Sequence, residues 1–286
     1  MSTELWLQLV LNGLVVGMVY VLVAAGLNLL LGVAGLFNFA HGDFYMLGAY
    51  LLFATYAVFH LNYGLALVIT TIVIAFFGVI CYRAVFHRIR TDVLLCLVAS
   101  VGIGLVFEQG ALVGFGTTPR GLPPVFKGII SVGGITLPQE RLVVILLSLI
   151  AMLALYFIIM KTKIGKAIRA VSSDVDAAHL QGISSGRIFL IVMAMGCALA
   201  GIAGGIIAPV YAVFPLMGEN MLMVILIIII LGGLGSMPGA IVGGLLVGMM
   251  HSFSSHFFSG LSELFILCCV GAILVFKPWG IFGHEH

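Results

Sequence analysis

The sequence predicts an all-α membrane protein, a polytopic integral membrane helical bundle of 8–9 spans with interrupted helices. Hydrophobic residues make up 63% of the 286 positions and charged residues only 8%, with a mean hydropathy of +1.30. A soluble domain carries about a quarter charged residues, so water is not the solvent for most of this surface. The 37 glycines are a second indication, because small residues let membrane helices approach closely. We expect residues 1–286 to form a single transmembrane domain.

Apolar segments long enough to cross a bilayer follow one another along the whole chain. The count depends on its start: if both segments before Leu65 cross fully, the N-terminus is outside and there are nine spans, and if one is re-entrant there are eight. The predicted segments are Leu5–Leu31, Phe39–Phe59, Leu65–Tyr82, Val93–Phe115, Leu142–Met160, Ile188–Ala208, Met221–Leu234, Ala240–Phe257 and Leu264–Phe276.

Basic residues gather in three places, and these set the predicted orientation. Three arginines lie within residues 83–90, five Lys and Arg residues lie within 161–187, and Lys277 lies in the tail. The positive-inside rule places all three groups in the cytoplasm, and the number of spans between them agrees. Residues 116–141, rich in Pro and Gly, are then outside.

Two glycine-rich stretches look like breaks within helices. Residues 31–45 and 231–239 both contain Leu-Gly-x-x-Gly followed by a new helix start. Transporters with inverted repeats use such breaks to aim half-helix ends at a substrate. The competing interpretation is a chance likeness between glycine-rich turns, since short loops between spans need glycine in any case.

Asp43 is the only acid between Glu4 and Asp92 and falls at or within the membrane. A charged side chain costs about 3 kcal/mol at the centre of a spanning helix, which makes Asp43 a functional candidate. The simpler interpretation, which we favour, is that Asp43 caps a helix beginning at Phe44 near the interface. Asn38 and His41 carry the same ambiguity.

A polar stretch, residues 161–187, interrupts the apolar run and is the one place where a soluble partner can hold the protein. Ser173 with Asp176 three residues later is typical of a capping box, and Asp174 and Asp176 suit the positive end of a helix. Gly182 supplies a C-terminal stop. We therefore predict a short, Ala-rich helix on the cytosolic face.

Several classes of function are excluded by what the sequence lacks. There is no phosphate-binding loop, because Gly165-Lys166 has neither the preceding glycine nor the following hydroxyl, and there is no Gly-x-Ser-x-Gly or His-Glu-x-x-His motif. The five cysteines lack metal-ligand spacing. A net charge of +2 without basic runs among aromatics excludes nucleic acid. We expect no catalytic residue, no bound metal and no cofactor on this chain.

With those residues in view, the chain resembles the permease subunits of branched-chain amino acid (leucine, isoleucine and valine) ABC importers, specifically the shorter of the two paired permeases. The resemblance covers essentially the whole chain, although residues 161–187 lack the Glu-Ala-Ala opening of many other ABC importer permeases. Four ordered motifs carry it: Asn38-Phe-Ala-His-Gly-Asp-Phe44 with Gly48-Ala-Tyr50, Gly165-Lys-Ala-Ile-Arg-Ala170 with Asp174, Ala178 and Gly182-Ile183, Gly232-Gly-Leu-Gly-Ser-Met-Pro-Gly-Ala240, and Lys277-Pro-Trp-Gly-Ile-Phe-Gly283.

The resemblance implies a set of partners in a prokaryotic cytoplasmic (inner) membrane. These are a second homologous permease subunit, two cytosolic ATPase subunits that bind ATP and Mg²⁺, and an extracytoplasmic amino-acid binding protein. It also implies that Asp174–Gln181 is the coupling helix that meets the ATPases. The residues expected at that contact are Arg169, Ser173, Asp174, Asp176, Ala177, Ala178, Leu180 and Gly182.

An amino acid with an aliphatic side chain needs a few polar groups in an otherwise apolar path. Half-helix N-termini near the two breaks can present backbone amides to its carboxylate. We therefore expect Asn38, His41, Asp43 and Ser236 along the substrate path.

Three alternatives stay open at this point. A related importer of urea or short amides has permeases that resemble these. An ion-coupled transporter or channel would use Asp43 or Glu108 as its proton site and would work as a single purified chain. A passive structural membrane subunit would leave the coupling-helix motif without a role.

Overall fold

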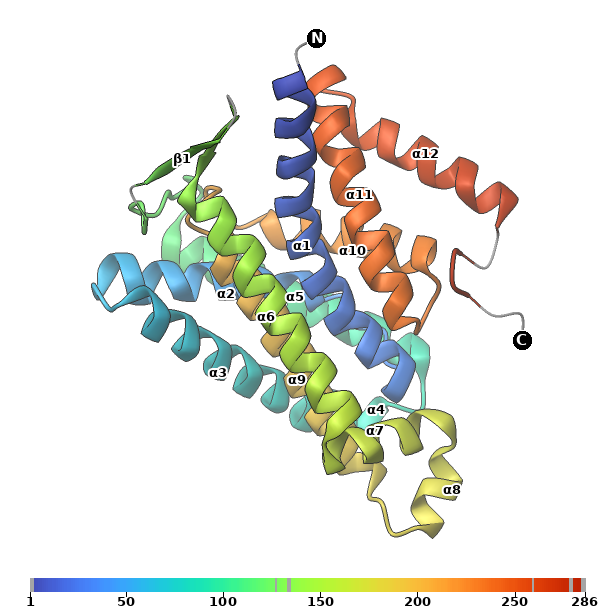
Figure 1. The fold of residues 1–286 in the computed structure, drawn as a ribbon. Coiled ribbons are helices and arrows are strands. Elements are labelled where there is room, and N and C mark those ends of the chain that lie inside the picture. The colour runs from blue at the N-terminus through green and yellow to red at the C-terminus, as the bar shows by residue number, and fades with distance from the viewer. Residues whose placement is uncertain (1–2, 127, 133–134, 259, 278–279, 284–286) are drawn as a thin grey trace.

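The computed structural model describes residues 3–126, 128–132, 135–258, 260–277 and 280–283. They form a bundle of helices with one small hairpin (Figure 1). In chain order the elements are α1 (Thr3–Ala34), α2 (His41–Leu52), the π-helix η1 (Phe53–Val58), α3 (Tyr63–Cys81), the π-helix η2 (Tyr82–Phe86), α4 (His87–Ile89), α5 (Val93–Phe115), β1 (Ile129–Val132), β2 (Ile135–Pro138), α6 (Gln139–Lys161), α7 (Lys163–Ser173), α8 (Val175–Leu180), α9 (Ser185–Ile207), α10 (Met217–Gly232), α11 (Met237–Phe257) and α12 (Ser262–Phe276).

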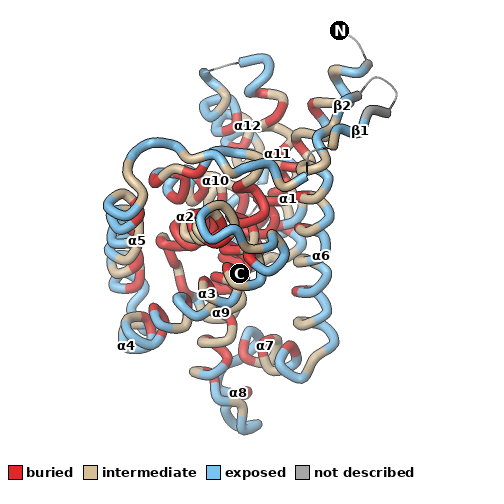
Figure 2. Tube along the Cα trace, turned by 90° about the vertical axis from the view of Figure 1, so that its left-hand side faces the viewer, coloured by how far each residue is buried: buried red, intermediate tan, exposed pale blue. Residues whose placement is uncertain are grey.

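The centre of the molecule is α1, which packs against α11, α9 and α6. Glycines permit these close approaches: a side chain at Gly248 would overlap the backbone of Gly17, and Cβ atoms added at Gly26 and Gly196 would each lie within 2.8 Å of the other residue's carbonyl oxygen. Figure 2 shows the result, with α1 mostly buried and α5 and α6 mostly exposed on opposite flanks. The high glycine content thus serves helix packing, as the composition predicts.

Six helices in the described residues are long and apolar enough to cross a membrane. Two shorter apolar helices, α10 and α12, have 16 and 15 residues, or roughly 24 and 22 Å of helix. The described chain therefore holds six to eight apolar helices, which agrees with the predicted polytopic bundle at its lower count. The long helices are Glu4–Ala34, Tyr63–Ile89, Val93–Phe115, Gln139–Lys161, Ser185–Ile207 and Met237–Phe257.

The second predicted segment, Phe39–Phe59, is not among the helices long and apolar enough to cross a membrane, which corresponds to the re-entrant alternative left open by the sequence. It corresponds to α2 and η1, which begin inside the molecule, where every residue from Ala40 to Met46 is buried. In Figure 1, α2 and α10 lie across the direction of α1. Their first turns meet, since a side chain at Gly42 would overlap the carbonyl oxygen of Gly218. Two half-helices therefore start against each other in the interior.

Both predicted helix breaks are present and lie together. The first follows α1, where Gly35 has φ +61°, and the second precedes α11, where Gly233 and Gly235 have φ +99° and +77°. A Cβ added at Gly32 would lie 3.2 Å from the Gly235 carbonyl oxygen. The long helix α1 precedes the first break, whereas the long helix α11 follows the second.

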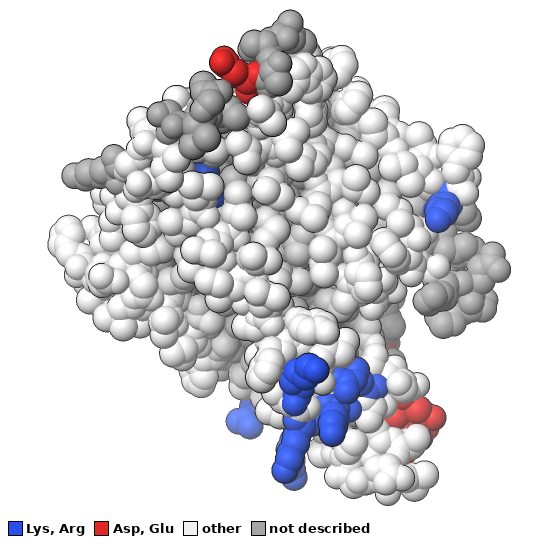
Figure 3. Space-filling view, viewed as in Figure 1, with Lys and Arg blue, Asp and Glu red and all other residues white. Residues whose placement is uncertain are grey.

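Figure 1 places α4, α7 and α8 at one end of the molecule and the hairpin and N-terminus at the other. The two basic loops predicted on one side therefore do share an end, and Figure 3 shows Lys and Arg gathered over α7 there. The third predicted group, Lys277, does not join them, because α12 is short and ends well away from α7 and α8 (Figure 1).

The all-α prediction missed the hairpin within residues 116–141. Strands β1 and β2 pair antiparallel, with Ile129 opposite Pro138 and Val132 opposite Ile135. Five of the eight strand residues are β-branched, which suits an extended backbone. The hairpin is a small addition that leaves the helical class unchanged.

Candidate functional site

The polar segment begins with α7, which is fixed to the end of α6. Thr162 makes the turn: its hydroxyl donates to the Ile158 carbonyl at 2.6 Å and accepts from the Gly165 amide at 3.0 Å. A side chain at Gly165 would overlap the carbonyl oxygens of Ile158 and Ile159. The Arg169 guanidinium donates to the Ile159 carbonyl. Arg169 therefore joins α7 to the exposed carbonyls that end α6.

The short helix α8 follows with its own cap. Asp174 has φ −159° and ψ 115°, and its Oδ1 accepts from the amides of Asp176 and Ala177 at 2.8 and 2.9 Å. The predicted capping box of Ser173 and Asp176 is wrong, because Ser173 is the last residue of α7 and its hydroxyl donates to the Arg169 carbonyl at 3.1 Å. The chain leaves the helical conformation one residue later, at Asp174.

The predicted stop at Gly182 is confirmed. Gly182 has φ +79°, its amide donates to the His179 carbonyl at 2.9 Å, and the Ile183 amide donates to the Ala178 carbonyl at 3.0 Å. This pair of bonds is a Schellman motif, for which glycine is the favoured residue. The His179 Nε2 atom also lies 2.8 Å from the Ser185 hydroxyl of α9, so α8 is tied to the helices on both sides.

The side chains of α8 divide into an inner and an outer set. Ala178 is 3% exposed, whereas Leu180 is 89% exposed. Val175, Asp176 and Ala177 are also exposed. Of the two predicted small contact residues, only Ala177 faces outward. Leu180 is therefore an apolar side chain exposed at the end of the molecule where Lys and Arg gather.

Three of the four residues predicted along the substrate path surround the start of α2. Asn38 and His41 are buried, and Asp43 is 9% exposed. The Asn38 Oδ1 atom accepts from the Ala40 amide at 3.2 Å and His41 Nε2 lies 3.2 Å from the Val23 carbonyl oxygen. Within the described residues, Asn38 Nδ2 and His41 Nδ1 have no hydrogen-bond partner. These buried groups form a polar cluster inside an apolar bundle.

Asp43 does not cap a helix beginning at Phe44, as we favoured from the sequence. The helix begins at His41, its N-cap is Ala40 without a side-chain bond, and Asp43 lies in the first turn. Its carboxylate fills the space between two other helices: Cβ atoms added at Gly104 of α5 and Gly218 of α10 would lie 2.5 and 2.6 Å from its oxygens. A carboxylate suits this place because the positive ends of two helices meet there.

The fourth predicted residue, Ser236, lies at the other break. Its hydroxyl accepts from the Gly239 amide at 3.2 Å, which caps α11. Among the described residues no hydrogen bond joins Ser236 to Asn38, His41 or Asp43. The structure therefore brings three of the four together and assigns the fourth a helix cap.

Comparisons with known proteins identify the family. Residues 9–276 match the family model described as the branched-chain amino acid transport system / permease component. The chain belongs to this family. It is 30% identical to the high-affinity branched-chain amino acid transport system permease protein LivH of Escherichia coli K12, over 97% of this chain and 96% of that protein.

Two further relatives separate the types of permease. The permease protein BraD of Pseudomonas aeruginosa is 28% identical and matches over 97% of this chain and 96% of its own length. The permease protein LivM of Escherichia coli K12 is 26% identical, and the match covers only 68% of it. The permease is therefore of the shorter, LivH-like type, as the sequence predicts. No solved structure matches the chain.

Membership of the family decides between the classes left open by the sequence. The permease is a multi-pass membrane subunit of a branched-chain amino acid ABC transport system, without a catalytic domain. A self-sufficient ion-coupled transporter and a passive structural subunit are therefore not supported. Among the described residues, no three His, Cys, Asp or Glu side chains come together as a metal site.

Asn28 is a buried polar residue between the two helix breaks that sequence reasoning missed. It is 1% exposed, its Nδ2 donates to the Ser236 carbonyl at 2.6 Å, and its Oδ1 accepts from the Gly235 amide at 2.6 Å. The signal was available: Asn28 is an amide side chain within an unbroken apolar run, and such groups find partners on neighbouring helices.

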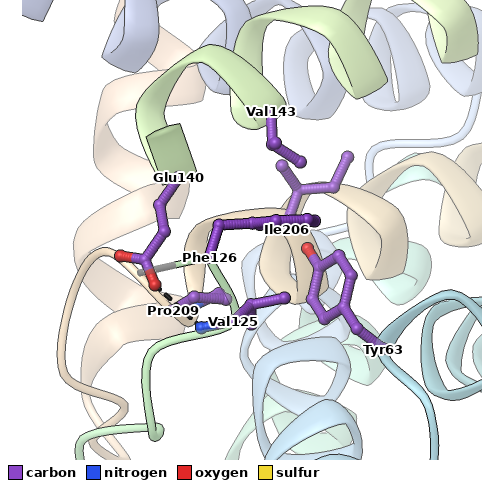
Figure 4. A pocket seen from close by; sticks show the side chains of 7 residues that line it. All are labelled: Tyr63, Val125, Phe126, Glu140, Val143, Ile206 and Pro209. Atoms are coloured by element: carbon purple, nitrogen blue, oxygen red, sulfur yellow. Dashed lines mark hydrogen bonds between the residues drawn. The ribbon is translucent and has the colours of Figure 1, made fainter. Parts of the chain in front are cut away.

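A shallow indentation lies between the first turns of α3 and α6 and the end of α9 (Figure 4). The Glu140 carboxylate at its edge accepts from the Val125 amide at 2.9 Å. Sequence reasoning singled out none of its residues. They are Tyr63, Val125, Phe126, Glu140, Val143, Ile206 and Pro209.

Proposed function

We propose that this permease pairs with a second homologous permease and two cytosolic ATPase subunits to import branched-chain amino acids delivered by an extracytoplasmic binding protein. ATP and Mg²⁺ would bind the ATPases and not this chain. The relatives' names support the substrate class. Residues 161–187 would lie in the cytoplasm as the coupling-helix loop.

One observation carries the proposal, the shape and exposure of α8. It is a capped helix of six residues that projects from one end of the molecule, with Leu180 89% exposed. Bonds at both ends hold it in place, through Asp174 and through His179 to Ser185. A short rigid element of this kind can seat in a partner and move as one body. Alternating access would follow when ATP closes the ATPase pair and the docked helices shift the two permease bundles.

Leu180→Asp should release the ATPase subunits, because it would bury a charge at the interface in place of an apolar side chain. The cost is on the order of several kcal/mol, which is comparable to the binding energy of a hot-spot residue. We expect the amount of ATPase that co-purifies with the permease to fall at least about tenfold. Gln181→Glu is the matched control, since it adds a charge to the adjacent exposed residue and should keep the ATPases bound. Full ATPase recovery with Leu180→Asp would remove α8 as the docking element.

We further propose that the cluster around Asp43 meets the substrate during transport. The Asp43 carboxylate already lies at the positive ends of α2 and α10. The site therefore suits the ammonium group of a substrate amino acid better than the carboxylate of that substrate. Asn38 adds an unpartnered amide nitrogen nearby in the chain. The apolar side chains of the surrounding bundle would accept the aliphatic side chain.

Asp43→Asn should lower leucine uptake about tenfold, because one charge-assisted contact is worth about 1.5–3 kcal/mol. Uptake by the reconstituted complex, at equal permease content, is the measurement, with Asn38→Ala as a second variant. Asp92→Asn is the control: Asp92 caps α5 by accepting from the Leu95 amide, a bond that asparagine preserves. Wild-type uptake by both interior variants would leave them a structural role only.

The substrate itself is tested by competition. We expect unlabelled leucine, isoleucine or valine to suppress labelled leucine uptake, whereas urea and short amides do not. Suppression by urea at similar concentrations would instead assign the complex to the related urea or amide importers.

A further inference from the structure

The segment that carries α8 also touches the broken end of α1. The Ser172 hydroxyl, two residues before the cap of α8, donates to the Gly32 carbonyl at 2.7 Å. Gly32 lies in the last turn of α1, where carbonyl groups lack partners within the helix. Ser172 supplies that partner from a neighbouring element, 140 residues away in the sequence.

The preceding turn of α1 contacts the second helix break. Asn28, one turn before Gly32, bonds the amide of Gly235 and the carbonyl of Ser236, both at 2.6 Å. The Ser236 hydroxyl in turn caps α11. The last two turns of α1 are therefore bonded to α7 through Gly32 and to the turn that begins α11 through Asn28.

The bond from Ser172 and the pair of bonds from Asn28 differ in how easily they break. Asn28 is buried, so its two bonds have no water to replace them and hold the turn firmly. Ser172 is exposed, so water can take its place when α7 moves. The contact next to α8 can therefore break and re-form while the bonds of Asn28 inside the bundle persist.

We propose that Ser172 and Asn28 are positioning residues that pass the movement of α8 to the two helix breaks beside the substrate path. Ser172 joins α7 to the end of α1, and Asn28 makes the end of α1 and the turn before α11 move together. This inference rests on the proposed function, since it requires that α8 receives movement from the ATPases. It adds the route by which that movement reaches the interior.

The test uses the complete complex reconstituted in liposomes with its binding protein. Ser172→Ala should keep the ATPase subunits bound and hydrolysing ATP, but should lower the amount of leucine transported per ATP at least about threefold. Ser172→Thr keeps a hydroxyl and should retain the wild-type ratio. Ser173→Ala is the matched control, because that hydroxyl bonds within its own helix to the Arg169 carbonyl, and it should also leave the ratio unchanged.

A second variant tests the inner bond. Asn28→Leu has a similar size but can neither accept from the Gly235 amide nor donate to the Ser236 carbonyl, and it should lower the same ratio while the ATPases stay bound. A wild-type ratio for Ser172→Ala, or an equal loss for Ser173→Ala, would overturn the inference. Retained ATPases with Leu180→Asp would instead overturn the proposed docking helix, so the two failures are distinguishable.

Discussion

Gly204→Val should prevent the permease from accumulating as a folded protein. Gly204 of α9 faces the backbone of α2: an added Cβ would overlap the Tyr45 carbonyl oxygen and lie 3.0 Å from the Ala49 amide nitrogen. Because these are backbone atoms, no rotamer change relieves the overlap, and α2 must move off α9. Overpacking costs about 1–3 kcal/mol where side chains can yield, and we expect more here.

The measurement is size-exclusion elution and thermal unfolding of the detergent-solubilised chain. We expect loss of the monodisperse peak, or a Tm lower by about 10 °C, which corresponds to roughly 3–4 kcal/mol in a chain of this size. Gly110→Val is the matched control, since nothing lies within 4 Å of a Cβ at that position on α5. Equal behaviour of the two variants would show that the contact between α2 and α9 does not limit stability.

Much of the bundle could be predicted because apolar runs are bounded by polar residues. The predicted segment Val93–Phe115 coincides with α5, and Leu142–Met160 lies within α6. The half-helix α2 could not be separated from a span in this way. Its interior start depends on partners from other helices, such as the Val23 carbonyl beside His41 and the Ser100 hydroxyl that accepts from the Phe39 amide.

The candidate site shows the same division between local and distant determinants. Gly182 was predictable because a position with positive φ at the end of a helix favours glycine, whatever the surrounding fold. The cap was misplaced by one residue because Ser173 and Asp174 both suit an N-cap, and only the backbone conformation chooses between them. Asn28 was missed because its partners lie 207 and 208 residues away, beyond any pattern of spacing.

Gly165→Val should leave the permease inserted but nearly abolish transport. A side chain there would overlap the carbonyl oxygens of Ile158 and Ile159, so α7 would be pushed off the end of α6. The bond from Arg169 to Ile159 would break with it. Because the damage lies at one end of the bundle, we expect a monodisperse protein whose leucine uptake falls more than about tenfold, a loss of roughly 1.4 kcal/mol or more in the coupled step.

Gly186→Val provides the control, since Gly186 lies near the start of α9 at the same polar end and an added Cβ there meets nothing within 4 Å. It should transport like the wild type, and comparison of uptake per ATP for the two variants isolates the seating of α7 from a general effect of valine. If Gly165→Val transported normally, the close packing of α7 against the end of α6 would not be required for transport. Movement of α8 would then have to reach the interior through the other anchor of α8, the bond from His179 to Ser185 on α9.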